Sequence, residues 1–114
     1  MQIVAAADGR DLGSTLSPFM ASARTLVFVE TSTMAIHTQP NPERLSSRSV
    51  DGETTRLLQD ADVDAVVVGS VDAGSLLALE RIGVPVYPVG RATVLEAIGA
   101  VESGRAHAAH TPTE

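Results

Sequence analysis

The sequence predicts a three-layer α/β fold, with a mixed five-stranded sheet and helices on both of its faces. Three observations predict this fold. Short runs rich in β-branched residues, typical of buried strands, recur along the chain. A long loop follows the first run and a tight turn separates the second from the third, which favours an antiparallel meander of strands one to three. The later runs alternate with segments of helical periodicity, and such helical crossovers bring strands four and five parallel to the first.

The length and composition indicate one core. The chain has 114 residues, of which 44% are hydrophobic, and this is near the usual size of a single domain. Only two Phe and one Tyr are aromatic, so Val, Leu, Ile and Ala must fill that core. We expect one α/β domain over residues 1–105, followed by a polar, disordered tail at residues 106–114.

The first half of the chain is expected to form three strands, at residues 3–7, 25–30 and 34–38. The first run ends at Asp8 and Gly9, a turn signal. Residues 10–23 contain Gly, Ser and Pro and are expected to form a long loop. Gln39 and Pro40 should end the third strand, because proline cannot donate a hydrogen bond to a neighbouring strand.

The second half is expected to alternate, with a helix from about residue 50, a strand at 65–69, a helix at 72–82, a strand at 84–87 and a last helix from residue 93. Ser49 or Asp51 could cap the first of these helices, whose apolar face carries Val50, Leu57, Leu58 and Ala61. Gly83 can adopt the left-handed conformation that commonly ends a helix, and is expected to cap the helix at 72–82. Thr93 and Glu96 form a capping box for the third, which ends at Gly104 and whose buried stripe is Val94, Leu95, Ile98 and Val101.

Charge and composition exclude several classes of function. The formal net charge is −6, and the eight basic residues are all Arg, scattered from Arg10 to Arg105 without a basic run, so nucleic-acid binding is disfavoured. No cysteine is present, which excludes disulfides, thiolate metal sites and thiol catalysis. No basic region precedes the first apolar run, and no apolar stretch is long enough to span a bilayer. We therefore expect a cytoplasmic protein without a membrane partner.

Short motifs follow one another in a specific order along residues 1–105. They are Ile3–Gly9, Leu16–Phe19, Asn41-Pro42, Val66–Gly69, Gly74 with Leu77, Ile82–Tyr87 and Thr93–Ala97. Their order and spacing resemble the dinitrogenase iron-molybdenum cofactor biosynthesis family, small nitrogenase accessory factor-like proteins with a ribonuclease H-like motif. The resemblance implies a non-catalytic carrier of an iron-molybdenum or iron–sulfur type cluster, with cluster-assembly proteins as partners.

A candidate site lies beyond the carboxyl ends of the strands, where ligands collect in parallel α/β sheets. Residues 8–22, 40–49 and 69–75 should converge there, and the helix that opens after Gly69 would offer its amides to an anion. Together with the matching motifs, this gives the candidate cofactor-binding residues Ser17, Phe19, Ser22, Asn41, Arg44, Arg48, Gly69, Ser70, Asp72 and Gly74. His37, near the end of the third strand beside these loops, is the candidate metal ligand.

Two other functions stay open. Residues 20–23 and 43–51 differ from the usual family sequence, which is compatible with a diverged small-anion or protein-interaction module that no longer binds a cluster. A more distant alternative is a magnesium-dependent ribonuclease H-like nuclease that uses Asp8 and Asp72. The third strand could pair with a second copy, so the protein is expected to be a monomer or a homodimer.

Each candidate residue also has a structural interpretation. His37 could be bonded to backbone or water at a strand end. His107 and His110 have a metal-compatible spacing, but they lie in the polar tail. Asp60, Asp62 and Asp64 resemble the start of a calcium loop but lack its glycine and closing glutamate, so we expect a solvated connection between helix and strand.

Overall fold

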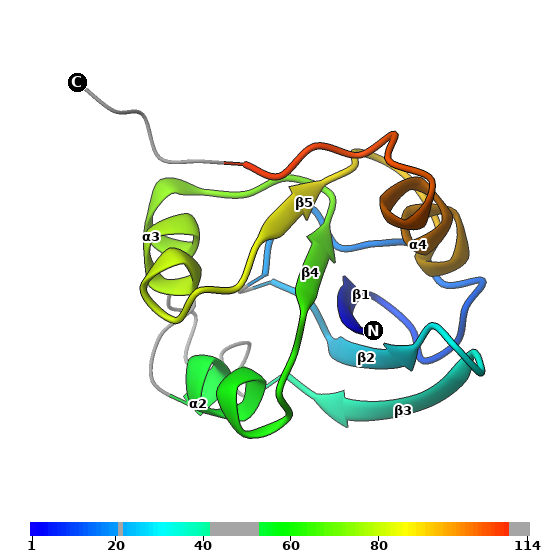
Figure 1. Ribbon diagram of the computed structural model, residues 1–114, viewed down its shortest axis with the longest axis horizontal. Coiled ribbons are helices and arrows are strands. Elements are labelled where there is room, and N and C mark those ends of the chain that lie inside the picture. Colours follow the sequence, from blue (N-terminus) through cyan, green and yellow to red (C-terminus); the bar gives the residue numbers. More distant parts are fainter. Residues whose placement is uncertain (21, 42–52, 110–114) are drawn as a thin grey trace.

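The computed structural model describes residues 1–20, 22–41 and 53–109 of the chain. In chain order its elements are β1 (Gln2–Ala7), β2 (Thr25–Glu30), β3 (Ala35–Pro40), α2 (Glu53–Asp60), β4 (Ala65–Val68), α3 (Ala73–Arg81), β5 (Val86–Pro88) and α4 (Val94–Glu102). The strands form one sheet in the order β3-β2-β1-β4-β5 (Figure 1). Strands β1, β2 and β3 pair antiparallel, and β4 lies parallel to both β1 and β5, so the predicted mixed sheet is confirmed.

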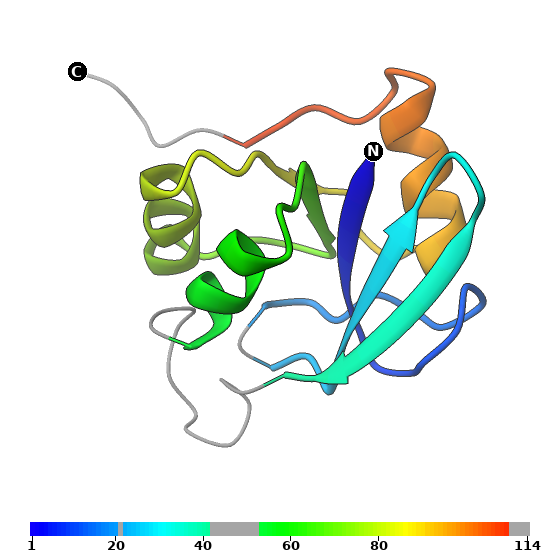
Figure 2. The ribbon, with the colours of Figure 1, turned by 60° about the horizontal axis from the view of Figure 1, so that its bottom comes forward.

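Helices cover both faces of the sheet, as predicted. Because successive side chains of a strand point to opposite faces, Val4 and Ala6 of β1 face α2 and α3, while Ile3 and Ala5 face α4. Figures 1 and 2 show α2 and α3 on one side of the sheet and α4 on the other. The alternation explains why β1 is buried almost throughout its length.

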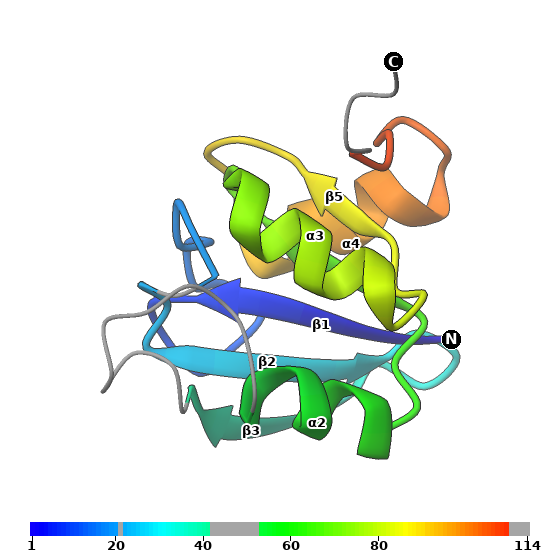
Figure 3. The ribbon, with the colours of Figure 1, turned by 90° about the vertical axis from the view of Figure 1, so that its left-hand side faces the viewer.

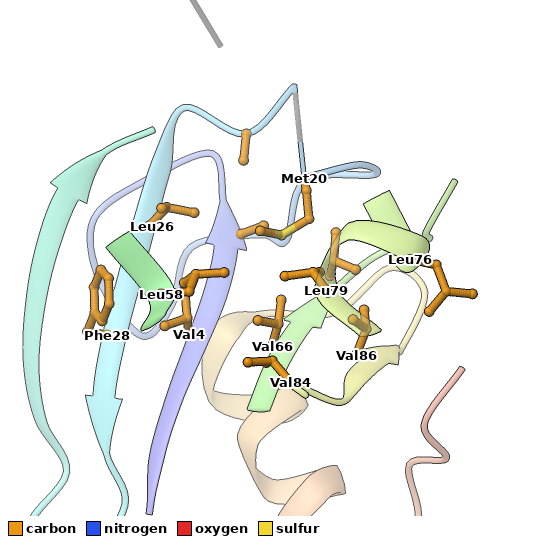
Figure 4. Packing of buried hydrophobic residues seen from close by; sticks show 13 residues of the cluster. Val4, Met20, Leu26, Phe28, Leu58, Val66, Leu76, Leu79, Val84 and Val86 are labelled. Carbon is orange, nitrogen blue, oxygen red and sulfur yellow. The ribbon is translucent and has the colours of Figure 1, made fainter. Parts of the chain in front are cut away.

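The core on the α2 and α3 side is built mainly from aliphatic residues, with Met20 of the first long loop inserted between the strands and the helices (Figure 4). Leu58 of α2 and Leu79 of α3 are fully buried in it. On the α4 side, Val94, Ala97 and Ile98 are buried. Leu95 is 50% exposed, so its predicted place in the buried stripe is wrong.

The helix ends follow the sequence signals. Gly83 and Gly104 adopt left-handed φ angles of 75° and 78° after α3 and α4. At the start of α4, the Glu96 amide donates to Thr93 Oγ1 at 3.1 Å, and the Thr93 amide donates to Glu96 Oε1 at 2.9 Å. The predicted capping box is confirmed.

The bounds of strands β3 and β5 differ from the prediction. Met34 has a φ of 59° and its amide donates to the Glu30 carbonyl oxygen at 2.7 Å, so it belongs to the turn and β3 begins one residue later. Strand β3 then continues through Pro40, and β5 is shifted to end at Pro88. Both are edge strands, which tolerate a proline because only one of their sides is paired.

The predicted cap of the first helix, Ser49 or Asp51, and its apolar Val50 lie outside the described residues. In the segment expected to be a tail, the Ala109 amide donates to the Val86 carbonyl oxygen at 2.8 Å, and Ala109 packs against the core on the α3 side. Residues 110–114 lie outside the described part. Among the described helices, none is long and apolar enough to cross a membrane.

Candidate functional site

The loop after β1 crosses the sheet at the carboxyl ends of β1 and β4. Figure 3 shows this loop at the edge where the β1 and β3 arrows end. The Ser17 amide donates to the Ala6 carbonyl oxygen at 2.8 Å. The Gly69 amide donates to the Ser17 carbonyl oxygen at 2.9 Å, and the Ser70 amide donates to that of Pro18 at 2.7 Å. The dipeptide Ser17-Pro18 therefore joins the ends of two parallel strands.

Gly69 is required for this close approach. A Cβ atom at this position would lie 2.9 Å from the Ser17 carbonyl oxygen, 3.1 Å from Pro18 Cα and 3.4 Å from the Gly90 carbonyl oxygen. All three are backbone atoms of two different loops, so no side-chain rotation can relieve the contacts. The glycine after β4 thus has a packing role, and it brings the loops after β1, β4 and β5 together.

The amino end of α4 is closed by the same loop. The Val94 amide donates to the Ser14 carbonyl oxygen and the Leu95 amide to that of Leu12, both at 2.9 Å. The third amide, of Glu96, is bonded to Thr93 as described above. Two amides of the first helical turn therefore anchor the loop and the third is capped by Thr93, so none of the three is directed at a ligand.

The amino end of α3 differs from the predicted anion cradle. The amides of Gly69 and Ser70, which precede the helix, are bonded to the carbonyl oxygens of Ser17 and Pro18 and are not available to a ligand. Asp72 is the helix N-cap, and its Oδ2 accepts a hydrogen bond from the Ser75 amide at 3.2 Å. An anion at this helix end would meet the carboxylate of Asp72, which already complements the helix dipole.

Two cavities open at the carboxyl edge, on either side of Asp8. The β4–β5 cavity has a volume of about 350 Å³ and is lined by Asp8, Thr15, Leu16, Pro18, Gly69, Ser70, Gly90 and Arg91. The β2–β3 cavity has a volume of about 430 Å³ and is lined by Asp8, Gly9, Arg10, Arg24, Thr25, Thr38, Gln39 and Pro40. Both are of the size of small-molecule sites in proteins. Of the predicted cofactor-binding residues, Gly69 and Ser70 line the first cavity directly.

Three other predicted residues shape the loop. The buried Ser17 hydroxyl donates to the Phe19 carbonyl oxygen at 3.0 Å and lies 2.9 Å from Ser22 Oγ, which also donates to that carbonyl oxygen. These bonds fold a turn that leaves the Phe19 side chain 43% exposed. The buried Asn41 carboxamide donates to the carbonyl oxygens of Met20 and Ala23 at 2.7 and 3.0 Å, and so ties the end of β3 to the same loop.

His37 does not lie where the sequence placed it. It is the third residue of β3 and pairs across the strands with Phe28, with the two rings edge to face at 5.0 Å. Phe28 faces α2, so His37 projects from that face in the middle of the strand and not from the carboxyl edge. Its Nε2 lies 3.1 Å from Nε2 of Gln39. The strand extends further than predicted, which is why His37 is not at its end.

The other candidates are placed as follows. Gly74 is exposed in the first turn of α3, whereas Arg44 and Arg48 lie outside the described residues. Asp64 Oδ2 accepts from the Gln2 amide at 2.8 Å, so this carboxylate joins β1 to the loop before β4. Within residues 1–20, 22–41 and 53–109, no three His, Cys, Asp or Glu side chains are grouped so that they could hold a metal ion.

Sequence reasoning missed the arginines at the two cavities. Arg10 follows β1 and Arg91 follows β5. The expectation that ligands collect beyond the carboxyl ends of the strands could therefore have identified these two residues. Arg24 precedes β2, and only the antiparallel register that pairs Ala7 with Thr25 brings it to the same edge. No carboxylate in the described part of the chain forms an ion pair with any of these three guanidinium groups.

The fold and the edge cavities define a small three-layer α/β protein with two cavities beyond the carboxyl ends of its strands. Residues 1–104 match the family described as dinitrogenase iron-molybdenum cofactor, and the chain belongs to this family. The resemblance found in the sequence is thereby confirmed. No match was found among curated protein sequences.

Solved structures share the fold. The apo form of the orange protein from Desulfovibrio gigas is 23% identical, with a TM-score of 0.83 over 99% of this chain and 96% of that one. A Thermotoga protein provisionally named NifB is 24% identical, with a TM-score of 0.80 over 99% and 97% of the two chains. A protein from Methanocaldococcus jannaschii, provisionally named a dinitrogenase, is 11% identical, with a TM-score of 0.71 over 98% and 97%.

Proposed function

We propose that this protein is a non-catalytic carrier that binds an anionic metal–sulfur cluster of the iron-molybdenum type in the β4–β5 cavity. The observation that carries the proposal is the lining of this cavity in a member of this family. Arg91 supplies a guanidinium group without a carboxylate partner in the described residues, next to the apolar walls of Leu16 and Pro18. Asp8 is the carboxylate of the same lining, so an anionic cluster would depend on the charge of Arg91, with Leu16 and Pro18 packing against its polarisable sulfide atoms.

The mode of binding follows from the composition. Iron–sulfur clusters that stay in a protein are usually held by cysteine thiolates, and this chain has none. The cluster would therefore be held through charge and hydrogen bonds, by Arg91 and by the hydroxyls of Thr15 and Ser70. Binding without a metal–thiolate bond leaves the cluster free to be passed on, as a carrier requires. Proteins of cluster assembly are the expected partners, and the cytoplasm is the expected location.

A carrier role, and not hydrolysis, is also supported by the carboxylates. Asp72 Oδ2 accepts a hydrogen bond from the Ser75 amide at the start of α3, so this carboxylate has a structural role as the helix cap. Asp8 separates two cavities whose other charged groups are arginines. The phosphate backbone of a nucleic acid would need a broad basic surface in addition to metal-binding carboxylates, whereas the net charge is −6.

The test is anaerobic loading with isolated iron-molybdenum cofactor, followed by desalting, metal analysis and absorption spectroscopy. We expect molybdenum to remain bound in a one-to-one ratio. Arg91→Gln should weaken retention about tenfold, because a charge-assisted contact is lost. His37→Ala and Arg56→Gln are the matched controls, since one lies in mid-strand on the α2 face and the other is exposed on α2. Both should load like the wild type.

Two results would count against the proposal. If the wild-type protein retains no molybdenum after desalting, carriage of the cluster is refuted. If it retains molybdenum but Arg91→Gln retains as much, the β4–β5 cavity is not the site. Circular dichroism of each variant before loading checks that the exposed substitutions leave the fold intact.

A further inference from the structure

The β2–β3 cavity is a second concave surface, separate from the proposed cluster site. The sheet register aligns Ala7, Thr25 and Pro40 in one row across β1, β2 and β3. The cavity lies at this row, with Arg10 from the loop after β1 and Arg24 from the residue before β2 on its walls. Neither arginine lines the β4–β5 cavity, and Arg91 does not line this one.

Four polar side chains of this cavity make no hydrogen bond or ion pair within the described residues. In the described part of the chain, no ion pair or hydrogen bond engages the side chains of Arg10, Arg24, Thr25 or Thr38. Thr38 pairs with Val27, two residues along β2 from Thr25, so both threonines project from the same face of the sheet. Two cations and two hydroxyls therefore converge on one volume of about 430 Å³.

We infer that the β2–β3 cavity binds a small oxyanion that carries at least two negative charges and one O–H group. Two guanidinium groups match two anionic oxygens or a bidentate carboxylate or phosphate. Asp8 is the single carboxylate of the lining, and it repels a bare anion but accepts a hydrogen bond from an O–H group. Hydroxycarboxylates and hydrogen phosphate both have this combination of charge and donor.

The experiment is calorimetric titration of the full chain at physiological ionic strength with citrate and, separately, with inorganic phosphate. Saturable one-to-one binding in the millimolar range or tighter is expected for one of these two probes. Which of them binds identifies the ligand as a carboxylate or a phosphate. If citrate binds, tricarballylate, which has the same three carboxylates but no hydroxyl, should bind to the wild type more weakly than citrate does. The two compounds should bind equally well to Asp8→Ala, which has no acceptor for the hydroxyl.

The variants separate this site from its neighbour. Arg10→Gln and Arg24→Gln should each weaken binding of the probe about tenfold. Arg24→Lys keeps the charge but loses the bidentate geometry, so its affinity for the probe should lie between those of the wild type and Arg24→Gln. Arg56→Gln, an exposed substitution on α2, should bind like the wild type. Arg91→Gln should leave this binding unchanged even though it weakens loading of the iron-molybdenum cofactor, so the two proposals can fail independently.

The inference is overturned if neither citrate nor phosphate shows saturable binding to the wild-type protein. It is also overturned if binding persists unchanged in the variant that combines Arg10→Gln with Arg24→Gln. A loss of affinity in Arg56→Gln as large as in Arg24→Gln would indicate a general effect of net charge, and would likewise refute a defined site at this cavity.

Discussion

Replacing Gly69 by alanine is the sharpest test of how the candidate site is assembled. The new Cβ atom would lie 2.9 Å from the Ser17 carbonyl oxygen and 3.1 Å from Pro18 Cα, so the two loops must separate. Separation stretches the hydrogen bonds from the amides of Gly69 and Ser70, which are 2.9 and 2.7 Å long. The substitution therefore combines overpacking with the weakening of two backbone hydrogen bonds.

The magnitude can be worked from these contacts. Overpacking costs about 1–3 kcal/mol, and each hydrogen bond contributes about 1 kcal/mol, although the bonds are weakened and not abolished. Alanine gives the unfolded chain less conformational freedom than glycine does, and this offsets about 0.4–1 kcal/mol of the destabilisation. We expect Gly69→Ala to lower the free energy of unfolding by about 2 kcal/mol, which corresponds to a fall in Tm of about 8 °C for a chain of this length.

Urea denaturation followed by circular dichroism measures the change, and Gly13→Ala is the matched control. A Cβ at Gly13 would have Asp11 Oδ1 at 3.5 Å, an ordinary van der Waals contact, so this variant should keep its stability to within about 0.5 kcal/mol. If Gly69→Ala is as stable as Gly13→Ala, the close approach of the loops does not hold the site together and the reasoning is refuted.

Three further substitutions test other parts of the fold. Asn41→Ala should cost about 2–3 kcal/mol in urea denaturation, because two buried carbonyl oxygens lose their donor, and a neutral result would show that the tie between β3 and the loop is dispensable. Leu79→Ala should cost about 2–5 kcal/mol through a core cavity, whereas Leu77→Ala, at a side chain 45% exposed, should cost far less; equal losses would contradict the packing. Thr93→Ala should lower the free energy of unfolding by about 1 kcal/mol through loss of the capping box, with no loss expected if α4 is held by packing alone.

The fold was predictable because its determinants are local. The four consecutive buried residues of β4 and the alternation of buried faces along β1 are direct consequences of apolar runs. The capping box at Thr93 and the left-handed Gly83 follow from residue type at a fixed offset. Errors arose where a local rule depends on tertiary context, since a proline ends a central strand but is tolerated in an edge strand such as β3.

The candidate site was less predictable because its determinants are not local. Ser17 and Asn41 were chosen as ligand-binding residues for their polar side chains, but the structure shows those side chains bonded within the loop. No sequence pattern reveals that the Gly69 amide is already paired with Ser17, because the two residues are 52 positions apart (69 − 17). Likewise, Arg24 reaches the carboxyl edge only through the register of β1 and β2.

Many backbone amides at the carboxyl edge are already hydrogen-bonded to the crossing loop, so the ligands proposed for this edge would be recognised mainly through side chains. Arg10, Arg24 and Arg91 are exposed and have no ion-pair partner in the described residues, which means that the fold does not depend on them. Each can therefore be replaced by glutamine with a change in stability of about 0.5 kcal/mol or less, while binding changes about tenfold. Ligand choice in this fold can then change without disturbing the framework of Ser17, Asn41 and Gly69.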